Sequence, residues 1–467
     1  MQETTVEGQR WTSLPVPALG EWTPTDSVCV VLPARDNQTE LDRTLAALVH
    51  QTYPADLLEV VVVDDSSEPP LVLPDLAPAG TRVVRRDEAQ SHGSGAARHA
   101  GALASDSDIV LFLDSDMLAD PRHVEAHARW HHVCDHAVVL GHKWFVAVDD
   151  LTPESIAAAG ASGTGVAALV EGRRQGTHAW QEDLIRDQDN LTHDVDDAFL
   201  AVVGATVSLR RAAYDRCGGF ASFGLRGIVD TEFGYRAFTS GCVIVPEEQA
   251  RSWHQGSRNF ASRGGEIKKE RLGLAANHLP VPMFRTQNTG RRWSVPMVRA
   301  VIDVTGTDLT QEWQAERLLL TVDSVLASDV TDLAVTVVDD GGLPSWWHDY
   351  VAAESRVEVT ADRRDVASGF PSPFTVVVPP GVVLGQGSLS AGLGLLSEEV
   401  RVVRTLPAWG GAQGLEIWRT RTLERALRVG LDRVPEDVLG EHWVSERALH
   451  VTRPQPRLTP QGMVTTW

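Results

Sequence analysis

Two aspartates that directly follow an apolar segment are the residues of this sequence best suited to chemistry. Asp114 and Asp116 flank Ser115, after the five apolar residues 109–113. Such a run without polar alternation predicts a strand buried on both faces, as in a parallel sheet. Because open α/β sheets bind ligands beyond the carboxyl ends of their strands, both carboxylates are expected at a ligand site. There they could hold Mg²⁺ or Mn²⁺ against substrate phosphates; a solvated acidic turn is the alternative.

The segments before these aspartates form a strand–helix–strand pattern that would position them. Buried strands are predicted at 28–32 and 60–63, and the helix between them carries its apolar residues on one face. A unit of this size predicts parallel strands joined by a right-handed crossover. Pro33 ends the first strand, Arg35 follows it, and the second strand runs into Asp64 and Asp65.

A glycine-rich stretch and two later residues add further candidates. Gly95 opens a predicted helix of small residues that carries Arg98. Glycines let a backbone approach a ligand closely, and a helix N-terminus favours an anion. The spacing is neither G-x-G-x-x-G nor a P-loop, so this stretch alone is a weak signal. Further on, Asp230 lies in the acidic first turn of a predicted helix, and His254 follows another predicted strand.

Composition narrows the class of protein. The chain has 467 residues, enough for two or three domains, with 43% hydrophobic and 22% charged residues, as in a globular protein. A net charge of -21 argues against binding to nucleic acid or an anionic membrane. No apolar run is long enough to span a membrane, and no signal peptide is evident. The four cysteines show no C-x-x-C spacing. We therefore expect a cytoplasmic protein with reduced thiols.

Taken together and in order, these motifs resemble those of the family 2 glycosyltransferases. The matching pieces are VCVVLPARDN, VVVVDDSS, GSGAARHAG, IVLFLDSDM, GATVSLRR, CGGF, VDTEFGYRAFTSG and WH. The resemblance implies an α/β protein with the GT-A fold, a Rossmann-like and mostly parallel sheet. It covers residues 27–256, the expected catalytic domain, after an N-terminal arm at 1–26 that we expect to lie on the surface. Residues 150–197 change character and are expected to form an insertion or lid.

The resemblance also implies which residues bind a UDP-sugar donor. Asp65 would contact the uracil and Arg98 the nucleotide; on the residues alone, a turn former and a surface cation are the alternatives. The full nucleotide-binding set would be Pro33, Arg35, Asp65, Gly95, Arg98, Asp114, Ser115 and Asp116.

Metal and acid–base roles follow from the same resemblance. Asp116, Asp114 and His254 would hold Mn²⁺ or Mg²⁺, which would neutralise charge on the leaving UDP. Asp230 would be the general base that deprotonates the acceptor, giving an inverting single displacement. Helix capping is the alternative for Asp230, and a structural role the alternative for His254.

Two positions depart from the family pattern. Val229 stands where a Glu is usual, and Glu232 is a candidate to compensate; Thr206 replaces a common Asn. Both departures put acceptor geometry in doubt more than donor binding.

The second half of the chain looks like a fainter copy of the first. Residues 334–341 echo 60–66, but Pro379, Pro380 and Gly381 stand where the aspartates would be. We expect 295–467 to be a smaller, degenerate GT-A-like domain without a metal site; an unrelated α/β domain is the alternative. Its expected roles are homodimer formation, acceptor recognition or a lid. Residues 257–294 are the most basic stretch, either a segment closing over the diphosphate or a solvated linker.

The leading hypothesis is therefore a metal-dependent, inverting hexosyltransferase that uses a UDP-sugar. The acceptor stays open among saccharides, peptides, lipid carriers and natural products. A GT-A relic that binds nucleotide without transfer is the second hypothesis, favoured by Val229. A sugar-phosphate nucleotidyltransferase ranks last, because the loop after the first strand, ARDN, is not the glycine-rich basic loop typical of that class.

Overall fold

The chain forms two compact units, which are described separately. The computed structural model describes residues 6–90, 93–223, 227–256, 264–285, 290–309, 311–361, 368–407, 413–434 and 436–453. The first unit comprises Met1–Phe238 with Cys242–Leu272, and the second comprises Thr239–Gly241 with Gly273–Trp467. The division falls within helix α9, Gly264–His278. Of the expected basic stretch, Arg258 and Arg263 lie outside the described residues.

The first unit is built on a nine-stranded sheet. Its strands follow the order β3-β2-β1-β4-β8-β6-β9-β5, and β7 pairs with β6. The strands are β1 Val28–Ala34, β2 Leu58–Asp65, β3 Thr81–Arg86, β4 Ile109–Leu113, β5 Met117–Ala119, β6 Ala137–Val146, β7 Gln175–Thr177, β8 Thr206–Arg210 and β9 Val243–Gln255.

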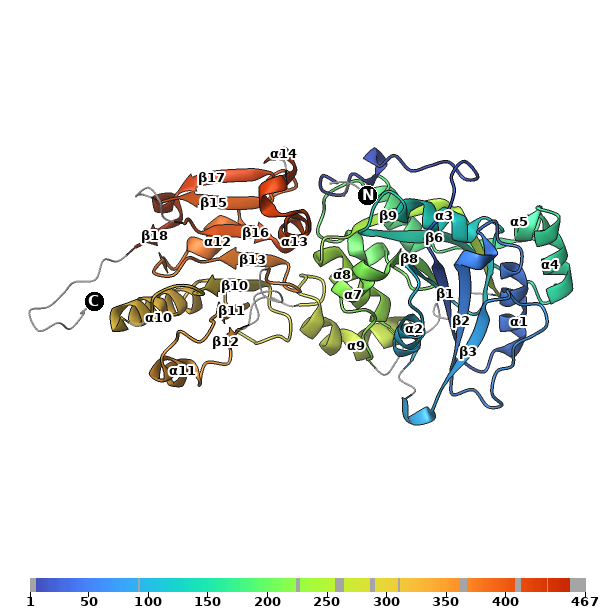
Figure 1. The fold of residues 1–467 in the computed structure, drawn as a ribbon, viewed down its shortest axis with the longest axis horizontal. Coiled ribbons are helices and arrows are strands. Elements are labelled where there is room, and N and C mark those ends of the chain that lie inside the picture. Colours follow the sequence, from blue (N-terminus) through green and yellow to red (C-terminus); the bar gives the residue numbers. More distant parts are fainter. Residues whose placement is uncertain are drawn as a thin grey trace, which may run out of the picture. The chain divides into compact units, whose positions relative to one another are not determined.

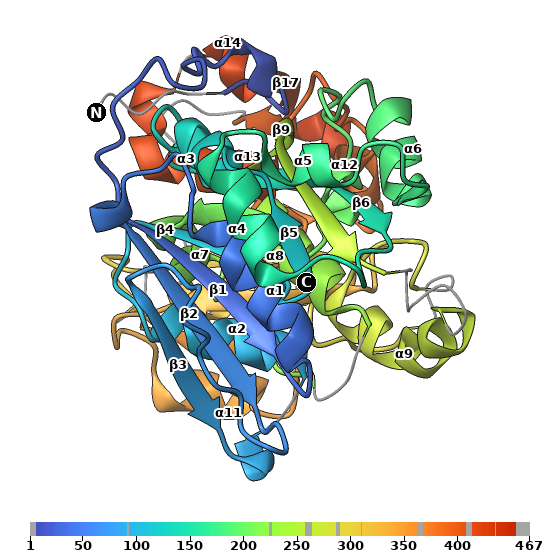
Figure 2. The same cartoon turned by 90° about the vertical axis from the view of Figure 1, so that its right-hand side faces the viewer.

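Parallel pairing brings the ends of β1, β2 and β4 to one edge of this sheet. Val28 pairs with Leu58 on one side and with Ile109 on the other. Strand β3 continues the parallel set beside β2, as Figure 2 shows. All five residues of β4 are buried, as the unbroken apolar run predicts. The residues that follow these strands in the sequence therefore lie at the same edge of the sheet.

Helices of the first unit pack against the sheet along its length: α2 packs on β1 and β2, and α3 packs on β6, β8 and β9. The predicted first helix forms as α1, and its residues Leu41, Leu45 and Leu48 are buried against β1 and β2. The helices of this unit are α1 Gln38–Leu48, α2 Ser94–Leu103, α3 His123–His131, α4 Pro153–Ala161, α5 Gly165–Leu169, α6 Ala179–Asp187, α7 Arg211–Arg216 and α8 Val229–Thr239, followed by α9.

The structure extends or changes some sequence-based expectations. The strand predicted at 137–140 is the longer β6, because it pairs antiparallel with β8 and parallel with β9. Residues 150–197 contain α4, α5, β7 and α6, and β7 joins the sheet by pairing with β6.

The N-terminal arm, expected on the surface, contributes to the core from residue 6 onward. Val6, Trp11 and Leu14 are buried in a cluster with residues of α3, β6 and β9. Trp11 lies edge-on to Trp130 at 5.5 Å between ring centroids. The stretch is polar overall, and this composition led to the expectation of a surface position. Its few large apolar side chains are nevertheless removed from water by packing against the first unit.

The second unit contains a seven-stranded sheet and a two-stranded one. The seven strands follow the order β12-β11-β10-β13-β16-β15-β17, and Figure 1 shows them side by side from bottom to top; β14 pairs with β18. The strands are β10 Val298–Asp303, β11 Leu333–Val338, β12 Val357–Thr360, β13 Phe374–Val377, β14 Val383–Leu384, β15 Val402–Leu406, β16 Glu416–Arg419, β17 Glu441–Ser445 and β18 Val451–Thr452.

The strand order of the second sheet repeats that of the first. Strands β10, β11, β12 and β13 are parallel, as are β1, β2, β3 and β4. In each sheet the next strand, β16 or β8, is antiparallel to its neighbours. The helices of this unit are α10 Glu312–Leu326, α11 Ser345–Val351, α12 Ser388–Leu393, α13 Thr420–Val429 and α14 Glu436–Leu439. Of all the helices described in the two units, none is both long and apolar enough to cross a membrane.

Candidate functional site

One buried arginine connects two carboxylates that are distant in the sequence. Nη2 of Arg98 donates to Oδ1 of Asp114 at 2.7 Å, and Nη1 donates to Oδ1 of Asp230 at 3.0 Å. Only 4% of the Arg98 side chain is exposed, whereas about a third of each aspartate is accessible. Burial opposes the charge of Arg98, but the two carboxylates outweigh it and raise the pKa of the guanidinium. The result is a fixed cation between two anions.

Asp114 lies in a different electrostatic setting from an ordinary surface aspartate. Burial raises its pKa; Arg98 opposes this effect, while the nearby Asp116 and Asp230 add to it. A carboxylate held among other carboxylates attracts cations, which is the character expected at a site that assembles metal and phosphate.

Three elements deliver this group. Arg98 lies on α2, Asp114 directly follows β4, and Asp230 is the second residue of α8. Helix α2 reaches α8 because Gly95 has no side chain: a Cβ there would lie 2.5 Å from Cγ1 of Val229. Gly95, for which a nucleotide contact stays a prediction, is in the structure the packing point between the two helices.

Gly204 is a site residue that the sequence analysis did not single out. A Cβ at this position would lie 2.6 Å from Cζ of Arg98 and 2.6 Å from Oδ1 of Asp230. Its absence of a side chain makes room for the arginine–aspartate pair. The only sequence signal was the position of this glycine in GATVSLRR, just before β8.

Asp116 and His254 meet beside the Arg98 group. Nε2 of His254 lies 3.1 Å from Oδ2 of Asp116. The contact arises because β5, which follows Asp116, pairs antiparallel with the end of β9 and places Met117 opposite His254. Burial opposes protonation of His254, but the hydrogen bond to Asp116 prevails and the pKa of the imidazole is raised.

Ser115 anchors the loop that carries the two aspartates. Its hydroxyl donates to the carbonyl of Pro33 at 2.8 Å and accepts from Nδ2 of Asn37 at 2.8 Å. Thr44 on α1 donates to the Ser115 carbonyl. Pro33 and Asn37 thus hold the loop in place through the Ser115 hydroxyl. Asn37 is a site residue that the sequence did not indicate.

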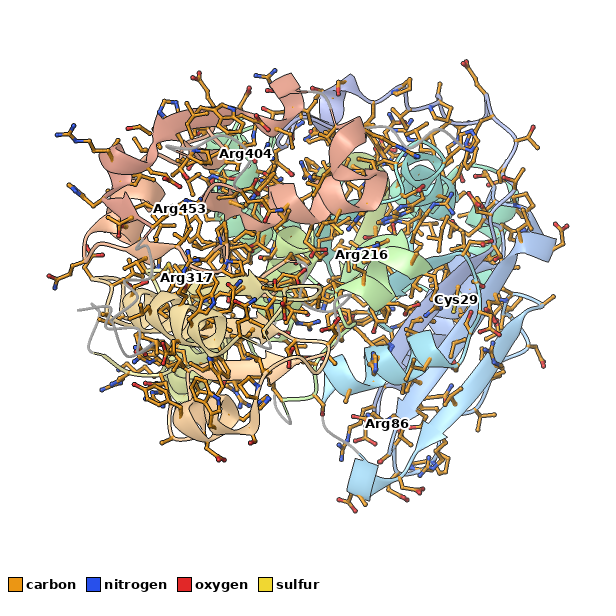
Figure 3. The ribbon with its side chains drawn as sticks, turned by 60° about the vertical axis from the view of Figure 1, so that its left-hand side comes forward. Cys29, Arg86, Arg216, Arg317, Arg404 and Arg453 are labelled. Carbon is orange, nitrogen blue, oxygen red and sulfur yellow. The ribbon has the colours of Figure 1, made fainter. Side chains whose placement is uncertain are left out.

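Asp65 is held by an arginine on the neighbouring strand. Nη1 of Arg86 donates to Oδ1 of Asp65 at 2.7 Å, and both side chains are nearly buried. Strand pairing places the two residues opposite each other at the ends of β2 and β3; Figure 3 labels Arg86 on β3. Asp64 has a different task, because it accepts the backbone N–H groups of Ser67 and Leu71. The sequence does not reveal that Arg86 lies opposite Asp65, because this depends on the register of β2 and β3.

Two residues considered from the sequence have other contacts. Arg35 is half-exposed, with Nε 3.6 Å from Oδ2 of Asp36. Glu232, the candidate to compensate for Val229, is buried and pairs with Arg236 on the same helix at 2.7 Å. Arg236 in turn donates to the carbonyl of Gly219, so Glu232 supports the turn before α8.

The three predicted metal ligands are only partly brought together. Asp116 and His254 are in contact, whereas Asp114 is engaged by Arg98; no cluster of three metal-binding side chains occurs among the described residues. Oδ1 of Asp116 is buried and has no hydrogen-bond partner. A carboxylate oxygen left unsatisfied in this way suits a hard cation, whose remaining ligands would be substrate phosphates and water. The residues present therefore fit a two-ligand site.

A buried polar cluster lies behind the site, between α3 and β8. His127 contacts the hydroxyls of Ser208 at 2.9 Å and Thr206 at 3.0 Å. His123 reaches Thr206 at 3.1 Å, and His131 reaches Ser208 at 2.8 Å. Thr206, noted as a departure from the family pattern, thus belongs to this buried cluster.

A pocket of about 370 Å³ lies elsewhere in the first unit. Residues of β6, α6 and the middle of β9 line it, and none of the predicted site residues is among them. An aromatic contact leads from the site toward it: Phe145 lies 5.0 Å from His254 and 6.1 Å from His178, a lining residue, between ring centroids.

The fold and the site together define a GT-A protein: a mostly parallel sheet with carboxylates and a bridging arginine at its carboxyl edge. The model of glycosyl transferase family 2 matches residues 29–156, which include Asp65, Arg98, Asp114 and Asp116. This match supports the predicted resemblance to the family 2 glycosyltransferases over residues 29–156, and the prediction of fold class is confirmed.

Curated relatives carry names consistent with this family. Chondroitin synthase of Escherichia coli is 24% identical over 338 residues, 68% of this chain and 47% of that protein. Pre-mycofactocin glycosyltransferase of Mycobacterium tuberculosis is 35% identical over 113 residues, 24% of this chain and 22% of that protein. The chain thus spans about half the length of the first relative and less of the second.

Solved structures share parts of the fold. A mannosyltransferase from Pyrobaculum calidifontis in complex with GDP-Man and Mn²⁺ is 19% identical, covers 58% of this chain and 67% of its own, and has a TM-score of 0.35. S. aureus TarS 1-349 in complex with UDP-GlcNAc is 18% identical, covers 50% and 59%, and has a TM-score of 0.34. At these scores the likeness carries no information about ligands.

Proposed function

We propose that the first unit transfers a sugar from a nucleoside diphosphate sugar, with UDP as the nucleotide, to an acceptor hydroxyl. The observation that carries this proposal is the Arg98 bridge between Asp114 and Asp230 beside the Asp116–His254 pair. In this arrangement Asp116, the proposed metal ligand, and the separate, partly exposed Asp230 lie at one sheet edge. A metal-binding carboxylate can serve the diphosphate leaving group while a second carboxylate serves the acceptor.

Donor binding is assigned to the residues around Asp116 and to Asp65. Asp116 and His254 would hold Mn²⁺ or Mg²⁺, which when bound neutralises charge on the diphosphate leaving group. Arg98 adds a fixed positive charge next to Asp114. Asp65, the last residue of β2, is oriented by Arg86, and its carboxylate could accept a hydrogen bond from a uracil N–H.

Acceptor activation falls to Asp230. The bond from Arg98 to one of its oxygens fixes the carboxylate, and a third of the side chain is accessible. A carboxylate held in this way can take a proton from an acceptor hydroxyl. Asp114 is engaged by Arg98 on the donor side, so we assign the base role to Asp230 alone, and a single base fits the inverting displacement that the family resemblance implies.

The experiment is a paired binding and turnover assay. Calorimetry would measure UDP binding with and without Mn²⁺ for the wild type and for Asp116→Asn, with the exposed Asp149→Asn as a matched control. We expect metal-dependent UDP binding that Asp116→Asn weakens at least tenfold and Asp149→Asn does not change. UDP binding that needs neither the metal nor Asp116 would contradict the donor site.

Turnover separates an enzyme from a binding relic. A panel of UDP-sugars would be incubated with Mn²⁺, and UDP release measured with and without candidate saccharide acceptors. Release that is lost in Asp230→Asn, while UDP binding persists, supports transfer. Tight metal-dependent binding without release for any donor would favour the non-catalytic alternative.

A further inference from the structure

The two sheets of this chain can be aligned residue by residue through their strand registers. Val28 pairs with Ile109 in the first sheet, and Val298 pairs with Phe374 in the second. Ile109 therefore corresponds to Phe374. Asp116 follows Ile109 by as many residues as Gly381 follows Phe374, so Asp116 corresponds to Gly381. The pairing of β1 with β2 and of β10 with β11 supports the same alignment, because Asp64 and Asp339 then correspond. Both accept backbone N–H groups of the turn that follows.

The same alignment assigns a counterpart to His254. In the first unit Met117 pairs with His254, and Leu118 pairs with Trp253. In the second unit Val383 pairs with Thr452, and extending this antiparallel register by one residue, beyond the ends of β14 and β18, aligns Val382 with Arg453. Val382 corresponds to Met117, and Arg453 therefore corresponds to His254. A permanently charged arginine stands where the first unit has a candidate metal ligand.

A second arginine occupies the place of the missing aspartate. Gly381 has a φ of +80°, and a Cβ there would lie 2.6 Å from Nη2 of Arg317 on α10. The Gly381 N–H donates to the hydroxyl of Thr321, one turn further along α10. The Arg317 guanidinium therefore lies against the backbone at the position equivalent to Asp116, at the carboxyl edge of the parallel strands.

Within the part of the chain that the structure describes, no acid balances the charge of Arg317. Its guanidinium lies over the ring of Trp313 at 5.5 Å, and its Nε is buried without a hydrogen-bond partner. Among the described residues no carboxylate forms an ion pair with it. Burial lowers the pKa of Arg317, and the proximity of Arg453 lowers it further. Arg453 itself donates to Glu446 at 2.8 Å, which leaves one positive charge in excess. Figure 3 labels Arg317 and Arg453 in the second unit.

We propose that this edge of the second unit binds an oxyanion without a metal, through Arg317 and Arg453. The ligand chemistry is a phosphate of a nucleotide or a carboxylate of an acidic sugar. Guanidinium groups recognise both, with paired N–H donors, and supply by themselves the positive charge that a cation would supply in the first unit. The proposal does not depend on catalysis by the first unit.

The test uses the full chain with EDTA, so that metal-dependent binding in the first unit is absent. Calorimetry would titrate pyrophosphate, UDP and glucuronate into the wild type, Arg317→Gln, Arg317→Lys and the exposed Arg433→Gln. We expect at least one of the three anions to bind, Arg317→Gln to weaken it at least tenfold, and Arg317→Lys to have an intermediate effect. Arg433→Gln should match the wild type.

The pattern of binding identifies the ligand or overturns the proposal. Binding of pyrophosphate and UDP alone assigns a phosphate site, whereas binding of glucuronate alone assigns an acidic-sugar site. No binding, or binding that Arg317→Gln leaves intact, overturns the proposal. Metal-dependent UDP binding that persists in Arg317→Gln shows that this variant is folded, and keeps the result separate from the donor site.

Discussion

Nη1 of Arg98 lies 3.0 Å from Oδ1 of Asp230, which joins α2 to the first turn of α8 across the carboxyl edge of the first sheet. The same guanidinium bonds Asp114 at the end of β4. A donor-side carboxylate and the candidate base are therefore linked by one side chain. A change at Arg98 should affect both binding and turnover, whereas a change at Asp230 should affect turnover alone.

Asp230→Asn removes the base but keeps the size of the side chain and an acceptor for Arg98. We expect kcat to fall by roughly 10²–10⁴-fold, the range typical of a lost general base. The dissociation constant for UDP with Mn²⁺ should change less than threefold. Steady-state kinetics and calorimetry on the same preparation would check this. A variant that retains wild-type kcat would exclude Asp230 as the base.

Arg98→Lys keeps the charge but cannot bridge two carboxylates with a planar fork. We expect the free energy of unfolding to fall by about 1–3 kcal/mol, as for the loss of a buried charged hydrogen bond. UDP affinity and kcat should both decrease. Arg122→Lys, a substitution at an arginine outside the Arg98–Asp114–Asp230 group, is the control. Urea titration and kinetics measure the two effects, and loss of stability without loss of UDP affinity would argue for a purely structural role.

Gly204→Ala should disturb the arginine–aspartate pair directly. The added Cβ would meet Arg98 and Asp230 at 2.6 Å, closer than real contacts allow. We expect kcat to fall at least tenfold because Asp230 must shift. Gly273→Ala is the control, since a Cβ there meets nothing within 4 Å. Equal activity of the two variants would show that the site tolerates a side chain at position 204.

The buried histidines of α3 predict a pH-dependent stability. Burial lowers the pKa of His123 to about 4 and of His131 to about 3, and holds that of His127 well below its ordinary value. The unfolded chain binds protons at its histidines near pH 6.5, where the folded chain does not. Their contribution is therefore complete above about pH 6.5 and is lost as pH falls toward about 4.

The slope of this dependence can be measured. Each such histidine contributes roughly 1.4 kcal/mol per pH unit within its window. Urea unfolding of the wild type between about pH 7 and pH 5 should show a steep loss, and His127→Gln should reduce the slope by one histidine's share. The exposed His193→Gln should not alter it. A flat wild-type profile would mean that these imidazoles charge without cost in the folded state.

Much of the first sheet could be predicted because apolar runs and turn residues are local signals. The strands of 28–34, 58–65 and 109–113 are buried on both faces, and such segments are recognised from unbroken apolar sequence. The positions of Asp65, Asp114 and Asp116 followed from these strands, because a chain that leaves parallel strands does so at one edge. The family resemblance came from the same local motifs.

The sequence alone thus predicted the buried parallel strands, the family resemblance and the sheet edge that carries the candidate site. Tertiary structure alone decided which side chains meet there. The contact of Arg86 with Asp65 depends on strand register, and Gly204 matters only because Arg98 and Asp230 converge beside it. Arg453 likewise lies close enough to Arg317 to lower the pKa of its guanidinium, although the two residues are far apart in the sequence. The physical reason is that a polar partner is chosen by distance in space, whereas apolar periodicity records only whether each residue is buried.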